Sequence, residues 1–235
     1  MSGQLHNMFA AVPRRYDRIN RLVTLGLDQG WRRRAARTCL EARPGSVLDL
    51  CTGTGDMPVI LARMAPPEVE LVAGDFVPEM LEAARDKARR AGVADRVCFE
   101  LADAADLPFP EGRFDAVTIT FGFRNLTYKN PGAEQHLAQI RRVLSPGGRL
   151  VFVESSQPAG RLMRAGFRAY LKAVVGPAGA LVSGEAGAYR YLSSSIRNYY
   201  SADQVAALLE EAGFADVGYK KLLGGAAAIH WASRP

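Results

Sequence analysis

Short apolar runs alternate with longer amphipathic stretches along most of the chain, and this alternation predicts strands separated by helices. Apolar runs bounded by turn residues are typical of strands buried on both faces of a parallel sheet, whereas apolar residues three or four positions apart are typical of helices. The resulting βαβα order predicts an α/β fold with a parallel sheet. The candidate strands are residues 47–51, 69–75, 97–102, 114–120 and 149–154, and the candidate helices between them are residues 58–64, 78–91 and 133–144.

Two segments depart from this alternation. Residues 9–36 predict a helical arm within an N-terminal segment that we take as residues 1–44. Residues 157–200 follow the fifth strand, contain no strand-like run and carry apolar residues at helical spacing, which predicts an insertion that covers a site. A length of 235 residues is ordinary for one α/β domain, so we expect arm and insertion to belong to a single domain spanning residues 1–235.

The C-terminal part predicts one more helix and a hairpin. Residues 201–212 predict a helix with Ser201 as its N-cap, and residues 217–223 and 226–232 predict a closing antiparallel hairpin. The Ser-Pro-Gly-Gly segment at residues 145–148 predicts a turn just before the fifth strand.

The first strand runs into the most informative turn of the chain. Gly53 and Gly55 allow the backbone to turn tightly and to approach a ligand closely. Asp75 ends the second strand, where this topology places an acid that bonds ribose hydroxyls. These features predict a cofactor that contains adenosine, although the same turn also occurs in α/β domains without a cofactor.

The residues around the turn narrow the choice of cofactor. The third glycine of a dinucleotide fingerprint is replaced by Pro58, and no Lys-Ser/Thr pair follows the glycines as in a P-loop. A nucleoside without phosphates therefore fits better than NAD, FAD or a nucleoside triphosphate. We favour S-adenosylmethionine, with its amino-acid end over Gly53 to Gly55.

Composition and charge exclude several classes of protein. No stretch approaches the roughly 20 apolar residues of a membrane helix. The first residues lack the basic and apolar regions of a secretory signal, so we expect a cytoplasmic protein. Three scattered cysteines in apolar sequence, Cys39, Cys51 and Cys98, predict buried free thiols and no metal site.

The formal net charge of +6 leaves two interpretations open. A basic protein can bind nucleic acid or an anionic membrane surface. Much of the excess, however, falls at Arg32 to Arg34 and at Arg141 and Arg142 on predicted helices, where solvated helix faces are the simpler interpretation. We therefore expect no nucleic-acid partner.

Several motifs together identify a family. The chain resembles the ubiquinone/menaquinone biosynthesis C-methyltransferases, class I S-adenosylmethionine-dependent enzymes, from about residue 9 to residue 231. Departures from the family pattern are Ile19 for Met, Thr24 for Ser, Asp28 for His and Thr120 for Ser. The matching segments are Tyr16-Asp17-Arg18-Ile19-Asn20 with Trp31, the loop at 53–56, Phe121-Gly122-Phe123-Arg124-Asn125, residues 142–148 continuing to Glu154-Ser155-Ser156, and Tyr189-Arg190-Tyr191-Leu192 with Ser195-Ile196.

The resemblance implies a Rossmann-like sheet of seven strands with helices on both faces, S-adenosylmethionine as cofactor and a prenylated quinol as substrate. It implies that a carboxylate at Asp103 meets the adenine amino group, although a helix N-cap is the simpler role for such a residue. The expected cofactor-binding residues are Gly53, Thr54, Gly55, Asp75, Phe76, Asp103, Ala104 and Thr120.

The chemistry of ring methylation points to Arg124 and Asn125 as catalytic residues. Ionising a quinol hydroxyl makes the neighbouring ring carbon nucleophilic, and phenols ionise only near a pKa of about 10. A cation aimed at the oxygen lowers that pKa. Because a guanidinium keeps its proton, we assign Arg124 the stabilisation of the quinolate and Asn125 the orientation of the oxygen or of a water. Solvent, Asp17 and Tyr16 remain candidates for the proton acceptor.

Other polar residues receive structural roles. His6, His136 and His230 lie far apart in sequence without a nucleophile nearby, so we expect them in the core or on the surface.

We expect the reaction to convert a demethylmenaquinol to menaquinol. Methylation of a 2-methoxy-6-polyprenyl-benzoquinol, the corresponding step toward ubiquinone, is the close alternative, and a nucleic-acid methyltransferase is a rival of another class. The oligomeric state is open, a homodimer included. The insertion pairs apolar with basic side chains, which predicts contact with the prenyl tail and peripheral contact with the inner face of a membrane: Leu162, Met163, Phe167 and Tyr170 with Arg161, Arg164, Arg168 and Lys172.

Overall fold

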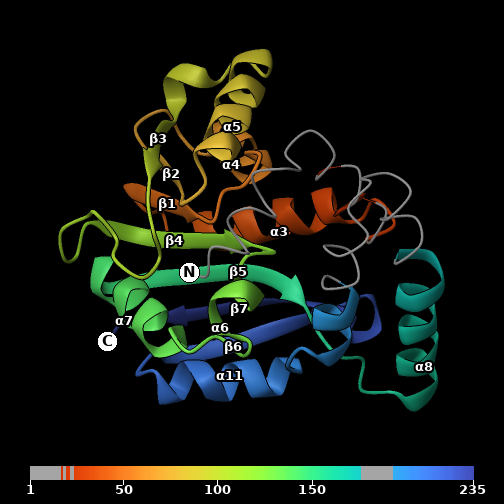
Figure 1. The fold of residues 1–235 in the computed structure, drawn as a ribbon. Coiled ribbons are helices and arrows are strands. Elements are labelled where there is room, and N and C mark those ends of the chain that lie inside the picture. The colour runs from red at the N-terminus through yellow and green to blue at the C-terminus, as the bar shows by residue number, and fades with distance from the viewer. Residues whose placement is uncertain (1–16, 18–19, 22–23, 176–192) are drawn as a thin grey trace.

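The computed structural model describes residues 17, 20–21, 24–175 and 193–235. Its centre is a seven-stranded sheet with the order β3-β2-β1-β4-β5-β7-β6 (Figure 1). The strands β1 to β5 pair in parallel, and β7 runs antiparallel to β5 and to β6. This sheet confirms the predicted fold class. The strands are β1 (Ser46–Leu50), β2 (Glu70–Asp75), β3 (Cys98–Leu101), β4 (Phe114–Thr120), β5 (Leu144–Ser155), β6 (Ala215–Leu222) and β7 (Ala227–Ser233).

Helices cover both faces of the sheet, as predicted. On one face lie α3 (Asp28–Leu40), α4 (Asp56–Met64) and α5 (Pro78–Arg90), and on the other α6 (Phe123–Thr127), α7 (Ala133–Val143) and α11 (Ala202–Glu211). The remaining helical segments are η1 (Ala94–Arg96), α8 (Arg161–Tyr170), η2 (Leu171–Val175) and η3 (Leu223–Gly225). Within the described part of the chain, no helix has the length and apolar content to cross a membrane.

Successive side chains of the central strands point alternately toward the two layers of helices. In β1, Val47 packs with α3 and α4, whereas Leu48 and Leu50 pack with α6 and α7. All residues of β1 are buried, which is why apolar residues of this strand face both helix layers and do not alternate with exposed polar residues. The sheet is thereby packed on each face against a hydrophobic core, and these cores position the ends of its strands.

The predicted helical arm is interrupted in its described part: residues 17, 20, 21 and 28–36 are helical, but residues 24–27 form a turn. Leu25 and Gly26 adopt left-handed conformations with φ of 54° and 76°, which an α-helix cannot include, and α3 begins only at Asp28. The helix then continues beyond the predicted end to Leu40. Most of the arm before residue 24 lies outside the described residues.

Two features near β5 refine the prediction. The strand begins at Leu144, five residues earlier than expected, because Leu144 already pairs with Phe114 and the Ser-Pro-Gly-Gly segment forms a bulge within the strand. The insertion contains α8, η2 and a helical stretch at residues 193–198.

The closing hairpin and the Ser201 cap are confirmed, with Ser201 Oγ accepting from Gln204 N.

Candidate active site

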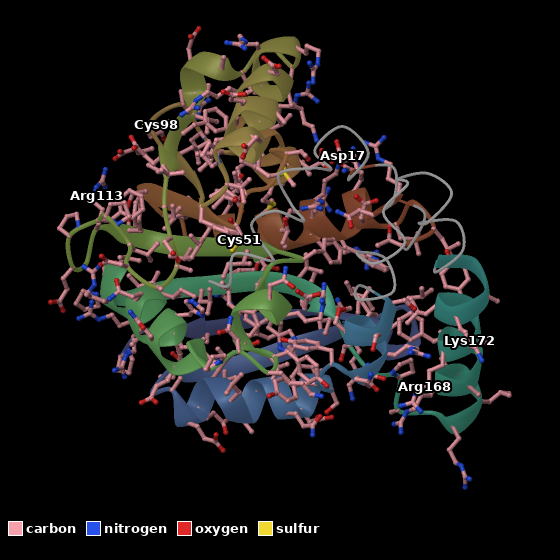
Figure 2. The ribbon with its side chains drawn as sticks, viewed as in Figure 1. Asp17, Cys51, Cys98, Arg113, Arg168 and Lys172 are labelled. Atoms are coloured by element: carbon pink, nitrogen blue, oxygen red, sulfur yellow. The ribbon has the colours of Figure 1, made fainter. Side chains whose placement is uncertain are left out.

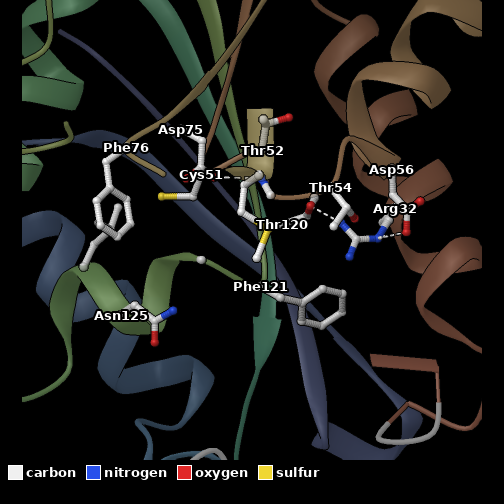
Figure 3. Close-up of a pocket in the computed structure, with 14 residues that line it drawn as sticks. Arg32, Cys51, Thr52, Thr54, Asp56, Asp75, Phe76, Thr120, Phe121 and Asn125 are labelled. Carbon is white, nitrogen blue, oxygen red and sulfur yellow. Dashed lines mark hydrogen bonds and ion pairs between the residues drawn. The ribbon is translucent and has the colours of Figure 1, made fainter. Parts of the chain in front are cut away.

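Two pockets open near the carboxyl ends of the parallel strands and share Phe121 as a common wall. The first, here called the loop pocket, is lined by residues of the β1–α4 loop, the end of β2 and the β4–α6 segment (Figure 3). The second, here called the insertion pocket, is lined by residues of α3, α6, α8, the end of β5 and η3, among others. Ligands of open α/β sheets bind outside these strand ends, so both pockets lie where the topology predicts a site.

Glycine is required at two positions around the loop pocket. Gly55 has a φ of 87°, and a Cβ there would lie 2.8 Å from the Cβ of Ala84 on α5. A Cβ on Gly122 would lie 2.6 Å from the Cβ of Cys51. Both distances are shorter than the contact distance of two packed carbon atoms. Gly55 therefore lets the loop after β1 approach α5, and Gly122 lets the turn after β4 approach the loop after β1.

Asp75 braces the β1–α4 loop from the end of β2. Its Oδ2 accepts a hydrogen bond from Gly53 N at 2.8 Å, and its Oδ1 accepts from Val77 N at 3.0 Å. The side chain is 5% exposed, and burial raises the pKa of Asp75, an effect that the donations from Gly53 and Val77 offset in part. Because each carboxylate oxygen can accept more than one hydrogen bond, Asp75 retains acceptor sites for a ligand in the pocket.

The structure brings most of the predicted cofactor residues together. Gly55 instead packs against Ala84, and Ala104 is buried in the core of the α6–α7 face. Asp103 accepts from Ala105 N at 2.9 Å and forms a bridge with Asp106, so it begins no helix and the N-cap interpretation is wrong. Neither Asp103 nor Ala104 lines the loop pocket, whereas Gly53, Thr54, Asp75, Phe76 and Thr120 do, together with Asn125.

Arg124 lines the insertion pocket, and the next residue, Asn125, lines the loop pocket. It is 5% exposed, and its Nη1 donates to Ser195 Oγ at 2.5 Å. Glu154, 1% exposed at the end of β5, accepts from Arg124 N at 3.0 Å, and its other oxygen lies 3.8 Å from Arg124 Nε. Arg124 and Asn125 are consecutive on α6, so this helix presents one predicted catalytic residue to each pocket.

Asp17 is engaged by the β1–α4 loop. Its carboxylate accepts from Thr54 Oγ1 and lies 2.6 Å from Lys87 Nζ, which also lies 2.5 Å from Asp56 Oδ1. Burial alone would raise the pKa of Asp56, but the charges of Arg32 and Lys87 hold this pKa below its ordinary value. Asp17 lines neither pocket, so the structure does not place it as the proton acceptor. Tyr16, another candidate, lies outside the described residues.

Sequence reasoning missed two charged residues of the site. Arg32, predicted on a solvated helix face, is 5% exposed and lines the loop pocket, where its Nη1 donates to Thr120 Oγ1. Arg32 lies four residues from the buried Asp28 and Ala36, so it shares their face of α3, whereas Arg33 and Arg34 do not. Glu154 belongs to a family motif but had no assigned role, although an acid ending an apolar strand is unusual enough to indicate one.

The cysteine and histidine predictions hold only in part. Cys39 is buried, and burial raises the pKa of its thiol to about 12, but Cys98 is exposed because it lies on the edge strand β3. His136 and His230 are buried in the core, as one of the two expected roles requires, and burial lowers the pKa of His230 to about 4. His6 lies outside the described residues. Within the described ranges, no group of three acidic, histidine or cysteine residues is placed to hold a metal ion.

Comparison with known proteins places the chain in a family. The model of the ubiE/COQ5 methyltransferase family matches residues 1–234. A demethylmenaquinone methyltransferase of Deinococcus radiodurans is 47% identical over 210 residues, which are 89% of this chain and 84% of the relative. A ubiquinone/menaquinone biosynthesis C-methyltransferase of Geobacter sulfurreducens is 38% identical over 227 residues, which are 97% of this chain and 87% of the relative.

A solved structure supports the fold independently of close sequence similarity. A SAM-dependent methyltransferase from Aquifex aeolicus superposes with a TM-score of 0.56 at 21% identity, covering 81% of this chain and 82% of that one. We conclude that the chain belongs to the ubiE/COQ5 methyltransferase family.

Proposed function

We propose that the protein methylates a ring carbon of a prenylated naphthoquinol, converting a demethylmenaquinol to menaquinol. The observation that carries this proposal is the pair of pockets that meet at α6, one of mixed polar and apolar lining beside the glycine loop, the other mostly apolar with the buried cation Arg124. The name of the Deinococcus relative supports the naphthoquinol head group. The Geobacter relative, named for both quinones, supports the benzoquinol of ubiquinone biosynthesis as the alternative.

The residues of the loop pocket fit S-adenosylmethionine. Asp75 offers its carboxylate to ribose hydroxyls, and the side chains of Phe76, Met80 and Leu126 provide apolar surface for an adenine ring. Gly53 has no side chain, so a ligand in the loop pocket can lie directly against the main chain there. When bound, the cofactor supplies an electrophilic methyl group whose bond to sulfur breaks with the electron pair remaining on sulfur.

Arg124 prepares the quinol for the transfer. Its guanidinium stabilises the oxyanion left when a quinol hydroxyl ionises, and the charge delocalised into the ring makes the neighbouring carbon the nucleophile. A new carbon–carbon bond forms at that position, and the ring regains its aromaticity when the same carbon releases its proton to solvent. Asn125, on the loop-pocket side of α6, orients the oxygen or a water beside it.

Glu154 holds Arg124 rather than accepting the substrate proton. Its two carboxylate oxygens accept from Arg124 N, from Ser155 N at 2.8 Å and from Ser155 Oγ at 2.8 Å, and a guanidinium lies beside them. These donors engage both carboxylate oxygens, which leaves Glu154 directed at Arg124 and Ser155. Glu154 therefore fixes the backbone and the charge of Arg124 together.

The apolar part of the insertion pocket suits a prenyl tail. Trp31 of α3, Phe167 of α8, Ile196 of the helical stretch and Leu223 of η3 line it. Burial of each methylene group of a tail contributes about 0.8 kcal/mol, so several isoprene units would dominate the affinity. A head group without its tail is therefore expected to have a much higher KM at similar kcat.

The surface of α8 fits peripheral contact with an anionic membrane. Residues 161–172 contain no acid, Leu162 is 88% exposed, and Arg161 is exposed beside it. Figure 2 shows Arg168 on α8 and Lys172 on the adjoining η2 at the edge of the molecule, away from the sheet. Exposed apolar and basic side chains on one short helix favour reversible binding to a charged lipid surface, where each basic residue contributes about 1 kcal/mol.

The experiment that tests the function incubates the purified protein with S-adenosylmethionine and either tailed quinol, both kept reduced, and follows the products by mass spectrometry. We expect the naphthoquinol to gain one methyl group with the higher kcat/KM. Preference for the benzoquinol would reassign the head group, and absence of methylation on both would refute a quinol substrate. Flotation with anionic vesicles at low and high salt tests α8, and equal recovery at both salt concentrations would contradict an electrostatic contact.

A further inference from the structure

Arg32 is a buried cation inside the loop pocket. Its neighbour on α3, Arg33, is exposed to solvent, whereas Arg32 lines the pocket. One donor reaches Thr120 Oγ1, and Nε is buried without a hydrogen-bond partner. Figure 3 shows the guanidinium on the side of the pocket opposite Asp75. A guanidinium has five N–H donors, so Arg32 retains donors for a ligand.

We propose that Arg32 binds the carboxylate at the amino-acid end of S-adenosylmethionine. Among the described residues that line the loop pocket, Arg32 is the only cationic side chain. The nucleoside end of the ligand is assigned to the side of Asp75, so its amino-acid end extends toward Arg32. The planar fork of a guanidinium matches a carboxylate better than any other side chain does. The inference rests on the cofactor of the proposed function and adds to it the residue that recognises the cofactor's only anionic group.

The acids near Arg32 leave room for this role. Its Nε lies 3.7 Å from Asp28 Oδ2 and 3.9 Å from Asp56 Oδ2, and both distances exceed a hydrogen bond. Asp56 has a closer partner in Lys87, at 2.5 Å. The acids therefore compensate the buried charge and hold the guanidinium in place without occupying all of its donors.

A purely structural role is the competing interpretation, because Arg32 also ties α3 to Thr120 at the end of β4. The two roles differ in what they predict for ligands that lack the carboxylate. Decarboxylated S-adenosylmethionine lacks only this group, and 5′-methylthioadenosine lacks the whole amino-acid end. A structural tie would affect the binding of all three ligands, whereas a carboxylate contact affects S-adenosylmethionine alone.

The test measures the Kd of these three ligands by calorimetry for the wild type, Arg32→Gln and the control Arg33→Gln, which alters an exposed arginine on the same helix. Arg32→Gln should weaken binding of S-adenosylmethionine by about 10-fold to 100-fold, the range for a hydrogen bond to a charged group. Binding of the other two ligands should not weaken, and Arg33→Gln should bind all three as the wild type does.

Other outcomes overturn the inference. Equal weakening of all three ligands, or no weakening of any, would assign Arg32 a structural role only. If Arg32→Gln does not fold, the wild type and Arg32→Lys still decide: the wild type must prefer S-adenosylmethionine to its decarboxylated form, and Arg32→Lys must reduce that preference. If the wild type binds none of the ligands, the cofactor assignment itself fails, which separates that failure from failure of the inference.

Discussion

The two pockets that meet at Phe121 are built in different ways. Apart from Arg32, the loop pocket is formed by residues 51–126, which follow three neighbouring strands of the sheet. The insertion pocket collects side chains from positions as far apart as Asn20 and Ala227. The first pocket follows from the topology of the parallel sheet, whereas the second depends on how the arm and the insertion fold onto it. In the proposed function, the cofactor therefore binds where the topology of the sheet positions the chain, and the quinol binds where the arm and the insertion add to it.

Phe121 separates the two pockets from a strained position. Its φ of 61° lies in the left-handed region, which is costly for a bulky residue, and its N–H donates to Val153 O at 2.9 Å. The guanidinium of Arg32 lies 5.0 Å from its ring centroid. The left-handed conformation of Phe121 turns the chain sharply after β4, and the turn places Arg124 and Asn125 at the boundary between the pockets.

The largest effect is expected at the insertion pocket. Arg124→Ala should lower kcat by about 100-fold or more, because it removes a preorganised charge that stabilises the quinolate. The Kd for S-adenosylmethionine should stay near that of the wild type, since Arg124 does not line the loop pocket. Arg124→Lys should restore the rate only in part, because an ammonium lacks the planar fork. Normal turnover of Arg124→Ala on a tailed quinol would remove this residue from the mechanism.

A smaller effect, confined to the other pocket, is expected for Asp75→Ala. The loss of an acceptor for ribose hydroxyls should cost about 1.5 to 3 kcal/mol of binding free energy, the range for hydrogen bonds that involve a charged group. Calorimetry should show this loss for S-adenosylmethionine and for 5′-methylthioadenosine alike, while the KM for quinol changes little. A folded variant with unchanged affinity would reject Asp75 as the ribose ligand.

The smallest of the three effects is expected for Glu154→Gln, which keeps an acceptor for Arg124 N and removes the carboxylate charge. We expect a drop in kcat of about 10-fold, corresponding to one weakened charge-assisted hydrogen bond, with the KM and the cofactor affinity largely retained. Shifts in the pH profile of kcat would accompany the change, because the quinol ionises less readily beside a misplaced Arg124. If kcat and its pH profile match the wild type, Glu154 only stabilises the fold.

The same contrast explains which parts of the site were predictable. Gly53 and Asp75 were found because a parallel strand, a glycine turn and an acid one strand later have fixed spacing. Arg32 was missed because three consecutive arginines read as a solvated face, and only the register of α3 against the sheet shows which of them is buried. The interruption of the arm at Leu25 and Gly26 was missed because the prediction followed the helical periodicity on both sides and passed over Gly26, which adopts the left-handed conformation that glycine favours.

The proposed function requires that cofactor and quinol bind on opposite sides of Phe121 and meet at α6. A crystal structure with S-adenosylhomocysteine and a tailed naphthoquinone tests it most directly. We expect the ribose against Asp75 in the loop pocket and a ring oxygen within hydrogen-bond distance of Arg124 in the insertion pocket. A quinone ring that binds away from Arg124, or a nucleoside that binds away from Asp75, would contradict it.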